Sequence, residues 1–212
     1  MKDIVIYILT AVVIMFATNT HAAYAGGSGP FGTYMGMPIT EFNIGNGCID
    51  PIEFSKGNFI VYPPSKHEMF NLYFATVSPN NGLGCIKALK VDIYTDAYGE
   101  TVKSIYNNLV SKIEKKYGEP TARLDYLKEG SIWTDPIYYT MGLFKKEREV
   151  STIWVPAIDK NMVGGGLPNS IRSIEIGIKA KTINDCVVYI TYCFDNYDNV
   201  IEEINTTADE NL

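Results

Sequence analysis

The chain has 212 residues, of which 46% are hydrophobic and 20% charged, and its formal net charge is −6. This composition excludes a wholly disordered protein. The acidic balance argues against a nucleic-acid binder that works through a general basic surface. The length allows one domain or two small ones, so we expect a globular unit whose function must be read from local patterns.

The first 25 residues have the organisation of a signal peptide. Lys2 precedes an apolar run at 4–17, which is too short to span a bilayer because a span takes about 20 residues. Ala23-Tyr24-Ala25 then forms the small-x-small site that signal peptidase recognises. We therefore expect residues 1–25 to be removed on export to the periplasm or beyond, and 26–212 to form one domain. An uncleaved membrane anchor is the alternative.

The first part of the expected domain reads as a leader followed by strands. The glycine-rich residues 26–33 are expected to be a flexible leader, and a short strand is predicted at 59–62. Two longer strands at 70–78 and 83–94 are separated by Pro79-Asn80-Asn81-Gly82. The Asn-Gly pair in this link is a strong hairpin signal, so the sequence predicts an antiparallel pair here.

Two helices are predicted in the middle of the chain. Apolar side chains recur at three- and four-residue steps from Val102 to Tyr117, and Gly118 stands where a helix C-cap belongs. A second helix is expected to begin at Asp135-Pro136, with Asp as N-cap and Pro at the first helical position. It should end near Lys145-Lys146, because cations suit a helix C-terminus.

Three more strands are predicted at 150–155, 170–181 and 186–194, followed by a helix at 197–204 and a loose tail at 206–212. In the second of these strands, isoleucines alternate with polar residues, as expected of a half-buried antiparallel strand. The order of strands, helices, strands and helix predicts an α+β fold. We expect an antiparallel sheet of about five to six strands with two to three helices packed on one face.

The four cysteines are Cys48, Cys85, Cys186 and Cys193. An even number in a chain expected to reach an oxidising compartment favours at least one disulfide. Cys186 and Cys193 lie seven positions apart in one predicted strand, so they should face opposite ways about 23 Å apart, whereas a disulfide needs Cα atoms within about 7 Å. We therefore predict that these two do not pair. A Cys48–Cys85 bond stays open, and buried free thiols are the alternative.

Catalytic and metal-binding patterns are sparse. His67 is the one histidine beyond residue 25, so the expected domain cannot build a zinc site on two or three histidines, and it has no Gly-x-Ser-x-Gly serine elbow. A hydrolase would have to use a Cys–His pair or the carboxylates of Asp92, Asp96 and Glu100, whose spacing is more simply that of a helix start. The sequence therefore favours a non-enzymatic binding module without cofactor or metal, with an envelope hydrolase as the alternative.

Two groups of side chains are candidates for the binding surface. A long connection at 156–169 carries the apolar residues Met162, Val163 and Leu167, which indicates either partner contact or disorder. Tyr138 and Tyr139, neighbours on a predicted helix, cannot both face the core, and exposed tyrosines suit interfaces. We predict that these five residues contact another envelope or extracellular protein.

Short motifs between Gly82 and Trp154 resemble a family of uncharacterised exported bacterial proteins. The resemblance covers about a third of the chain and implies export, but no activity and no catalytic residue. The segment Gly36-Met37-Pro38-Ile39-Thr40-Glu41 is also similar to the Gly-Met-Thr-x-x-Glu start of small envelope assembly lipoproteins and β-lactamase-inhibitor-like domains. It has Pro where they have Thr or Ser, and it lacks their lipidation cysteine. The motifs behind the first resemblance are Gly82-Leu83-Gly84-Cys85-Ile86-Lys87-Ala88, Tyr98-Gly99-Glu100, Lys116-Tyr117-Gly118, Gly130-Ser131-Ile132-Trp133 and Lys146-Glu147-Arg148.

Overall fold

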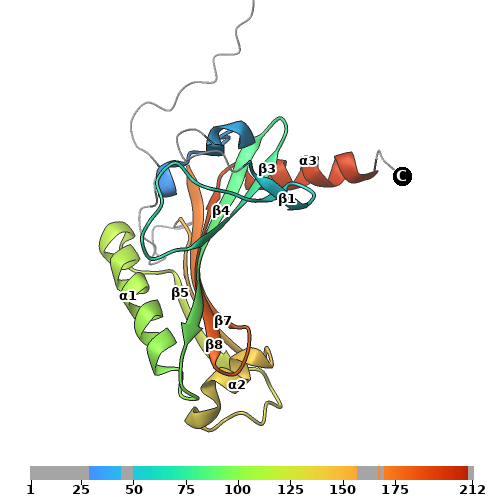
Figure 1. The fold of residues 1–212 in the computed structure, drawn as a ribbon. Helices are drawn as coiled ribbons and strands as arrows, with labels where there is room; N and C mark the ends of the chain where they lie inside the picture. Colours follow the sequence, from blue (N-terminus) through green and yellow to red (C-terminus); the bar gives the residue numbers. More distant parts are fainter. Residues whose placement is uncertain (1–28, 44–49, 157–166, 168–169, 210–212) are drawn as a thin grey trace, which may run out of the picture.

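The computed structural model describes residues 29–43, 50–156, 167 and 170–209. In these ranges the chain forms an α+β fold built on one antiparallel sheet (Figure 1). Its strands are β1 (Ile52–Ser55), β2 (Asn58–Ile60), β3 (Leu72–Ser78), β4 (Gly82–Tyr94), β5 (Ala122–Leu127), β6 (Arg148–Trp154), β7 (Ile171–Ala180) and β8 (Asp185–Phe194). The helices are α1 (Glu100–Tyr117), α2 (Tyr139–Phe144) and α3 (Tyr197–Asp209), with short 3-10 helices η1 (Pro30–Gly32), η2 (Ile39–Asn43) and η3 (Pro136–Tyr138).

The sheet has eight strands in the order β1-β2-β3-β4-β8-β7-β6-β5. The central pair, β4 and β8, joins the first half of the chain to the second. The expectation of five to six strands was therefore too low. The two strands it missed, β1 and β5, are the sheet's edges, where side chains are mostly exposed or half-buried and leave a weak apolar pattern.

The predicted hairpin of β3 and β4 is confirmed, and it contains a bulge. Thr76 pairs with Cys85 and Val77 with Leu83, so Gly84 is an extra residue on β4. Gly82, which ends the turn, has φ +63°, a left-handed conformation that glycine adopts without strain. The bulge turns Gly84 toward α3.

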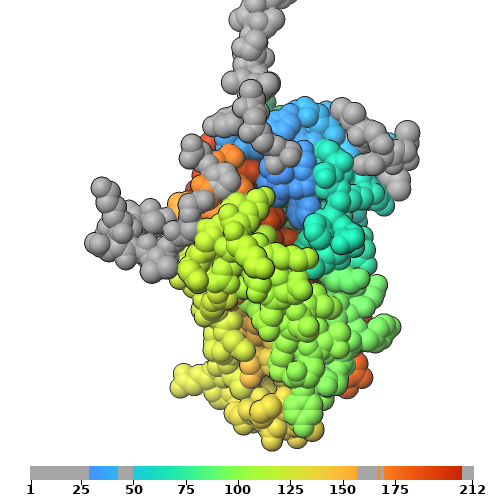
Figure 2. Space-filling view, turned by 90° about the vertical axis from the view of Figure 1, so that its left-hand side faces the viewer, coloured from blue at the N-terminus to red at the C-terminus, as the bar shows by residue number. Residues whose placement is uncertain are grey.

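The face of the sheet against α1, which we call the covered face, holds the main core. α1 ends as the sequence predicts, with the Gly118 N–H donating to the Glu114 carbonyl. Figure 2 looks onto α1 where it lies over the sheet, with the 29–43 segment and the α2 region beyond its two ends. Fully buried side chains beneath this layer include Trp154, Ile174, Ile176, Ile178 and Ile190.

α3 lies on the opposite face, so the expectation that the helices share one face is wrong (Figure 1). Its Val200 packs where Gly84 has no side chain, because a Cβ on Gly84 would lie 2.9 Å from a Val200 methyl carbon. Glu203 then accepts hydrogen bonds from Ser78, Asn80 and Asn81 in the β3–β4 turn. No other helix of the described ranges lies over the rest of this face, and we call it the open face.

The described residues of the expected leader and tail, 29–33 and 206–209, have defined structure. In the supposed leader, Pro30 is buried and Phe31 packs edge-to-face against Phe70, Tyr73 and Tyr192. At the other end α3 runs to Asp209, so it includes residues 206–209, which were expected in the tail. Apolar contacts of single residues, rather than glycine content, decide the order of such segments.

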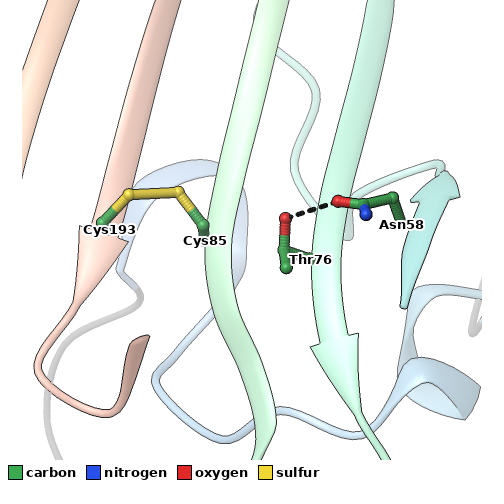
Figure 3. Close-up of a disulfide and its surroundings, with 4 residues drawn as sticks. All are labelled: Asn58, Thr76, Cys85 and Cys193. Carbon is green, nitrogen blue, oxygen red and sulfur yellow. Dashed lines mark hydrogen bonds between the residues drawn. A yellow bond between two sulfur atoms is a disulfide. The ribbon is translucent and has the colours of Figure 1, made fainter. Parts of the chain in front are cut away.

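A disulfide joins the two central strands on the open face. Cys85 on β4 and Cys193 on β8 are directly paired in register, with Cα atoms 4.2 Å apart (Figure 3). The row continues to Thr76 on β3, which donates to Asn58 on β2 at 2.9 Å. In this row of four adjacent strands, the disulfide links β4 to β8 and the side-chain hydrogen bond links β2 to β3.

The cysteine predictions are confirmed in part. One disulfide is present, and Cys186 and Cys193 do not pair, because β8 runs unbroken between them. The open alternative of a Cys48–Cys85 bond is wrong, since Cys85 is bonded to Cys193. Cys48 itself lies outside the described residues. Cys186 is a buried free thiol.

Candidate functional site

α2 and its neighbours form the end of the molecule opposite α3 (Figure 1). Asp135 caps η3 by accepting from the Ile137 N–H at 3.0 Å, and α2 follows directly, which confirms the predicted helix start. The Thr140 N–H donates to the carbonyl of Ala97 just before α1, and the β7–β8 turn bonds to the end of β4 through Thr95 and Asn184. These backbone contacts bring three connections of the chain together, β4–α1, β5–β6 and β7–β8.

This end of the molecule gathers exposed apolar side chains. Ile132 is 74% exposed. Seven of the eleven large hydrophobic side chains exposed in the described part of the chain lie in these connections, and we call them the apolar tip. They are Tyr94, Tyr98, Ile132, Ile137, Tyr138, Phe144 and Ile183. Exposed apolar side chains that gather in one region, rather than scattering singly, are typical of interaction sites.

As predicted, Tyr138 and Tyr139 are not both buried. Tyr138 is 43% exposed, and its ring stacks edge-to-face on Trp133 at 5.5 Å between centroids, which holds it in place. Tyr139 is only 5% exposed and fills the space beside Gly99, where a Cβ would collide with its ring. Only Tyr138 belongs to the apolar tip, and Tyr139 is a packing residue beneath it.

The other predicted contact residues do not join the tip. Met162 and Val163 lie outside the described residues. Leu167 is half-buried and packs against the hydrophobic core, and its contact with a partner stays a prediction. An apolar residue in a long connection can serve the core as well as a partner, and sequence spacing does not distinguish the two.

Most of the tip was missed in the sequence because its members come from three separate connections, β4–α1, β5–β6 (which contains η3 and α2) and β7–β8. Tyr94 ends β4, Tyr98 precedes α1, Ile183 lies in the β7–β8 turn and Ile132 in the loop before η3. Each is an isolated apolar residue in a polar stretch, which is normal for any surface. Their grouping arises only when the sheet brings these connections to one end.

The groups that a hydrolase would need are engaged elsewhere. Asp96 caps α1 by accepting from the Glu100 N–H at 3.0 Å, and Asp92 pairs with Lys181 at 2.9 Å. The His67 Nδ1 accepts from the Met69 N–H at 3.1 Å. Among the residues that the structure describes, no group of three His, Cys, Asp or Glu side chains can hold a metal ion.

The described cysteines are poorly placed to act as nucleophiles. Cys85 and Cys193 are oxidised, and burial raises the pKa of the Cys186 thiol to about 11, with the charge of Asp185 adding to the rise. A thiol with that pKa is almost wholly protonated near neutral pH, whereas the thiolate is the reactive form. In the described part of the chain, a Cys–His pair therefore has no suitable cysteine.

Two hollows flank the β1–β2 hairpin at the other end of the molecule. An apolar pocket of about 570 Å³ lies between η2, the hairpin and Ile204 of α3. A shallower one of about 550 Å³ lies on the open face over the disulfide, bordered by Phe54, Lys87 and Tyr197. Neither contains a cluster of catalytic groups. Ile52 and Phe54 on β1 are exposed, which makes this hairpin the natural comparison for the apolar tip.

No family model matches the chain, and neither a curated protein nor a solved structure matches it. No helix in the described ranges is long and apolar enough to cross a membrane.

Proposed function

We propose that this protein is an exported, non-enzymatic binding module that contacts another envelope or extracellular protein through the apolar tip. The gathering of seven exposed apolar side chains at one end of the sheet carries the proposal. Interface cores are enriched in aromatic residues, and three of the seven are tyrosines, whose rings bury apolar area while the hydroxyls stay hydrogen-bonded.

The support beneath the tip favours binding by a preformed surface. Trp133 holds Tyr138 from below, and Tyr139 anchors α2 against the start of α1. Side chains that are already ordered lose less conformational entropy on binding than side chains on a free loop. Rigid aromatic anchors are also the residues that most often dominate binding energy.

The experiment compares two double variants of the full chain as bait for cross-linked capture in cells that export it. Ile132→Ser with Tyr138→Ser removes two tip side chains, and Ile52→Ser with Phe54→Ser removes two other exposed apolar side chains, from β1. We expect the tip variant to lose a discrete captured protein by about tenfold or more, as for interface anchors. The β1 variant should capture it like the parent.

Thermal unfolding of both variants separates binding from folding. Both pairs are exposed, so we expect each variant to keep a melting temperature within about 2 °C of the parent, consistent with small effects of surface substitutions. Equal capture by the tip variant and the parent would overturn the proposal. So would loss of the captured protein from the β1 variant alone.

Export is part of the same proposal and has its own measurement. The Cys85–Cys193 bond supports it, because structural disulfides persist in oxidising compartments. Intact-mass analysis of protein from the periplasm or medium should give a chain that begins at Gly26 and is two hydrogens lighter than its reduced form. A full-length mass in the cytoplasm or in a membrane fraction would contradict it.

A further inference from the structure

A polar pocket of about 440 Å³ opens on the covered face between α1, β5, β6 and α2. Lys103, Tyr106 and Asn107 line it from one side of α1, because residues three and four apart lie on the same helix face. Arg123 and Asp125 line it from β5, two positions apart and hence on the same face of the strand. One face of α1 and one face of β5 therefore line the same pocket.

Tyr139 closes one end of this pocket with an unpaired hydroxyl. The residue is 5% exposed and lines the pocket, and its hydroxyl has no hydrogen-bond partner among the described residues. The hydroxyl oxygen keeps some exposure to solvent, because it is not among the fully buried polar atoms that lack a partner. Since Tyr139 lines the pocket, this exposure is toward the pocket. Burial raises the pKa of Tyr139, so the group stays a hydrogen-bond donor at neutral pH. A buried donor without a partner normally needs one.

The other donors of the pocket are cations and an amide. Lys103 Nζ lies 4.2 Å from the centroid of the Tyr139 ring and pairs at 3.3 Å with the exposed Glu100. Arg123 pairs with Glu114 at 2.8 Å and with Glu119 at 3.7 Å. Exposed ion pairs of this kind contribute little to stability, so either cation can turn to a ligand at low cost.

The one carboxylate that lines the pocket is already neutralised. Asp125 is paired with Arg148, whose guanidinium also lies 4.8 Å from the Tyr139 ring. The lining therefore offers a tyrosine hydroxyl, an ammonium, a guanidinium and the Asn107 amide, and its single carboxylate is already paired. Such a set of donors fits oxygen atoms that carry negative charge.

We propose that this pocket binds a small oxyanion, the carboxylate or phosphate group of a small molecule. The Tyr139 hydroxyl and the Asn107 amide donate hydrogen bonds to it, while Lys103 and Arg123 supply the positive charge. The site is separate from the exposed side chains of the apolar tip. The inference therefore stands or falls without the proposed function.

The experiment titrates the full chain with inorganic phosphate, succinate and glucose at constant ionic strength, with binding followed by calorimetry and by amide NMR shifts. We expect saturable binding of phosphate or succinate, with shifts in α1 and β5, and no binding of glucose. Whichever of the two anions saturates identifies the oxyanion. Absence of saturation by both, or equal binding of glucose, would overturn the proposal.

Two matched pairs of variants place the ligand. Tyr139→Phe removes only the hydroxyl and should weaken binding by about tenfold or more, the usual loss for a hydrogen bond to a charged group. Tyr138→Phe, which removes an exposed hydroxyl one position earlier, should bind like the parent. Arg123→Gln should also weaken binding, while the exposed α1 variant Lys112→Gln should not, and this pair decides the outcome if Tyr139→Phe does not fold. Unchanged binding in Arg123→Gln and in a folded Tyr139→Phe would contradict the site.

Discussion

The carboxylate of Glu203 on α3 fixes the β3–β4 turn from the side. It accepts from Ser78 Oγ at 2.5 Å and from the backbone and side-chain amides of Asn80 and Asn81 at 2.7 to 3.2 Å. Burial alone would raise the pKa of this carboxyl, but these hydrogen bonds outweigh burial and hold the pKa below its ordinary value. The ionised form is therefore favoured by the folded state.

Replacing Glu203 with Gln tests this role. Gln keeps the shape but turns one acceptor into a donor facing other donors, so we expect a loss of about 1–3 kcal/mol in unfolding free energy at pH 7. Because the pKa is lower in the folded state, the carboxylate stabilises above its unfolded pKa of about 4.3, and this stabilisation is lost as pH falls through the folded pKa. Urea unfolding at pH 7 and pH 3 should show the difference between parent and variant shrinking in acid. The neighbouring exposed variant Glu202→Gln is the control, and an equal loss there would contradict the assignment.

Cys186 supplies a second test at the scale of one residue. Its side chain is fully buried and its pKa is raised to about 11, so iodoacetamide at pH 8 should not modify it in the folded protein. Unfolding in urea without reductant should expose it, while Cys85 and Cys193 stay protected by their disulfide. Peptide mapping after each treatment checks this, and modification of Cys85 or Cys193 without reductant would contradict the bond.

At the scale of elements, the close contact of β4 with α3 depends on Gly84. A Cβ there would lie 2.9 Å from Val200, and both residues lie in packed structure, so the contact cannot relax freely. We expect Gly84→Ala to destabilise the fold by about 1–3 kcal/mol, as other overpacking changes do. Adding Val200→Ala should recover part of that loss in a double-mutant cycle followed by urea unfolding. Simple additivity of the two changes would show that this contact does not position α3.

The elements that the sequence predicts are those with one strong pattern. The Asn-Gly turn gives β3 and β4, the three- and four-residue steps give α1, and alternation gives β7. β1 and β5 carry no such pattern, because an edge strand is paired on one side only. The sequence also could not predict which face of the sheet α3 covers. That choice depends on the one-residue bulge at Gly84 and on the contact of Glu203 with a turn more than 120 positions earlier. A sequence pattern describes one element at a time, whereas these features arise from contacts between two elements.

The candidate site shows the same division. The rule that Tyr138 and Tyr139 cannot both be buried follows from helix geometry and is confirmed. Leu167 packs against the core, because apolarity in a connection does not say whether the core or a partner covers a side chain. The apolar tip could not be predicted from the sequence, because Tyr94, Ile132 and Ile183 meet only after the sheet has formed.

At the scale of the whole molecule, the disulfide joins the two halves of the sheet. Cys85 and Cys193 are 108 positions apart, and closing a loop of about that length in the unfolded chain corresponds to roughly 4–5 kcal/mol in the chain-entropy model. We expect Cys85→Ser with Cys193→Ser to lower the unfolding free energy by about 2–5 kcal/mol. Denaturant unfolding of the reduced parent should match that of the double variant. A change below 0.5 kcal/mol in both would contradict a structural role for the bond.

The two ends of the molecule differ in what they offer to a partner. The end with α3 has its β3–β4 turn held by Glu203. Its exposed apolar residues are Tyr34 in the 29–43 segment and Ile52 and Phe54 on a short edge strand. The end with α2 presents the apolar tip on three connections, supported by Trp133 and Tyr139. We therefore propose that the end with α2 contacts the partner.

Site-specific photo-cross-linking in exporting cells tests that assignment most directly. A photoreactive side chain is placed at Ile132 in one chain and at Ile52 in another, since both positions are exposed and apolar and lie at opposite ends. We expect a discrete adduct of defined mass from position 132, and we expect it to be lost when Tyr138→Ser is added. Position 52 should give no such adduct. An adduct from position 52 alone, or none from position 132, would contradict the claim that the protein works through the apolar tip.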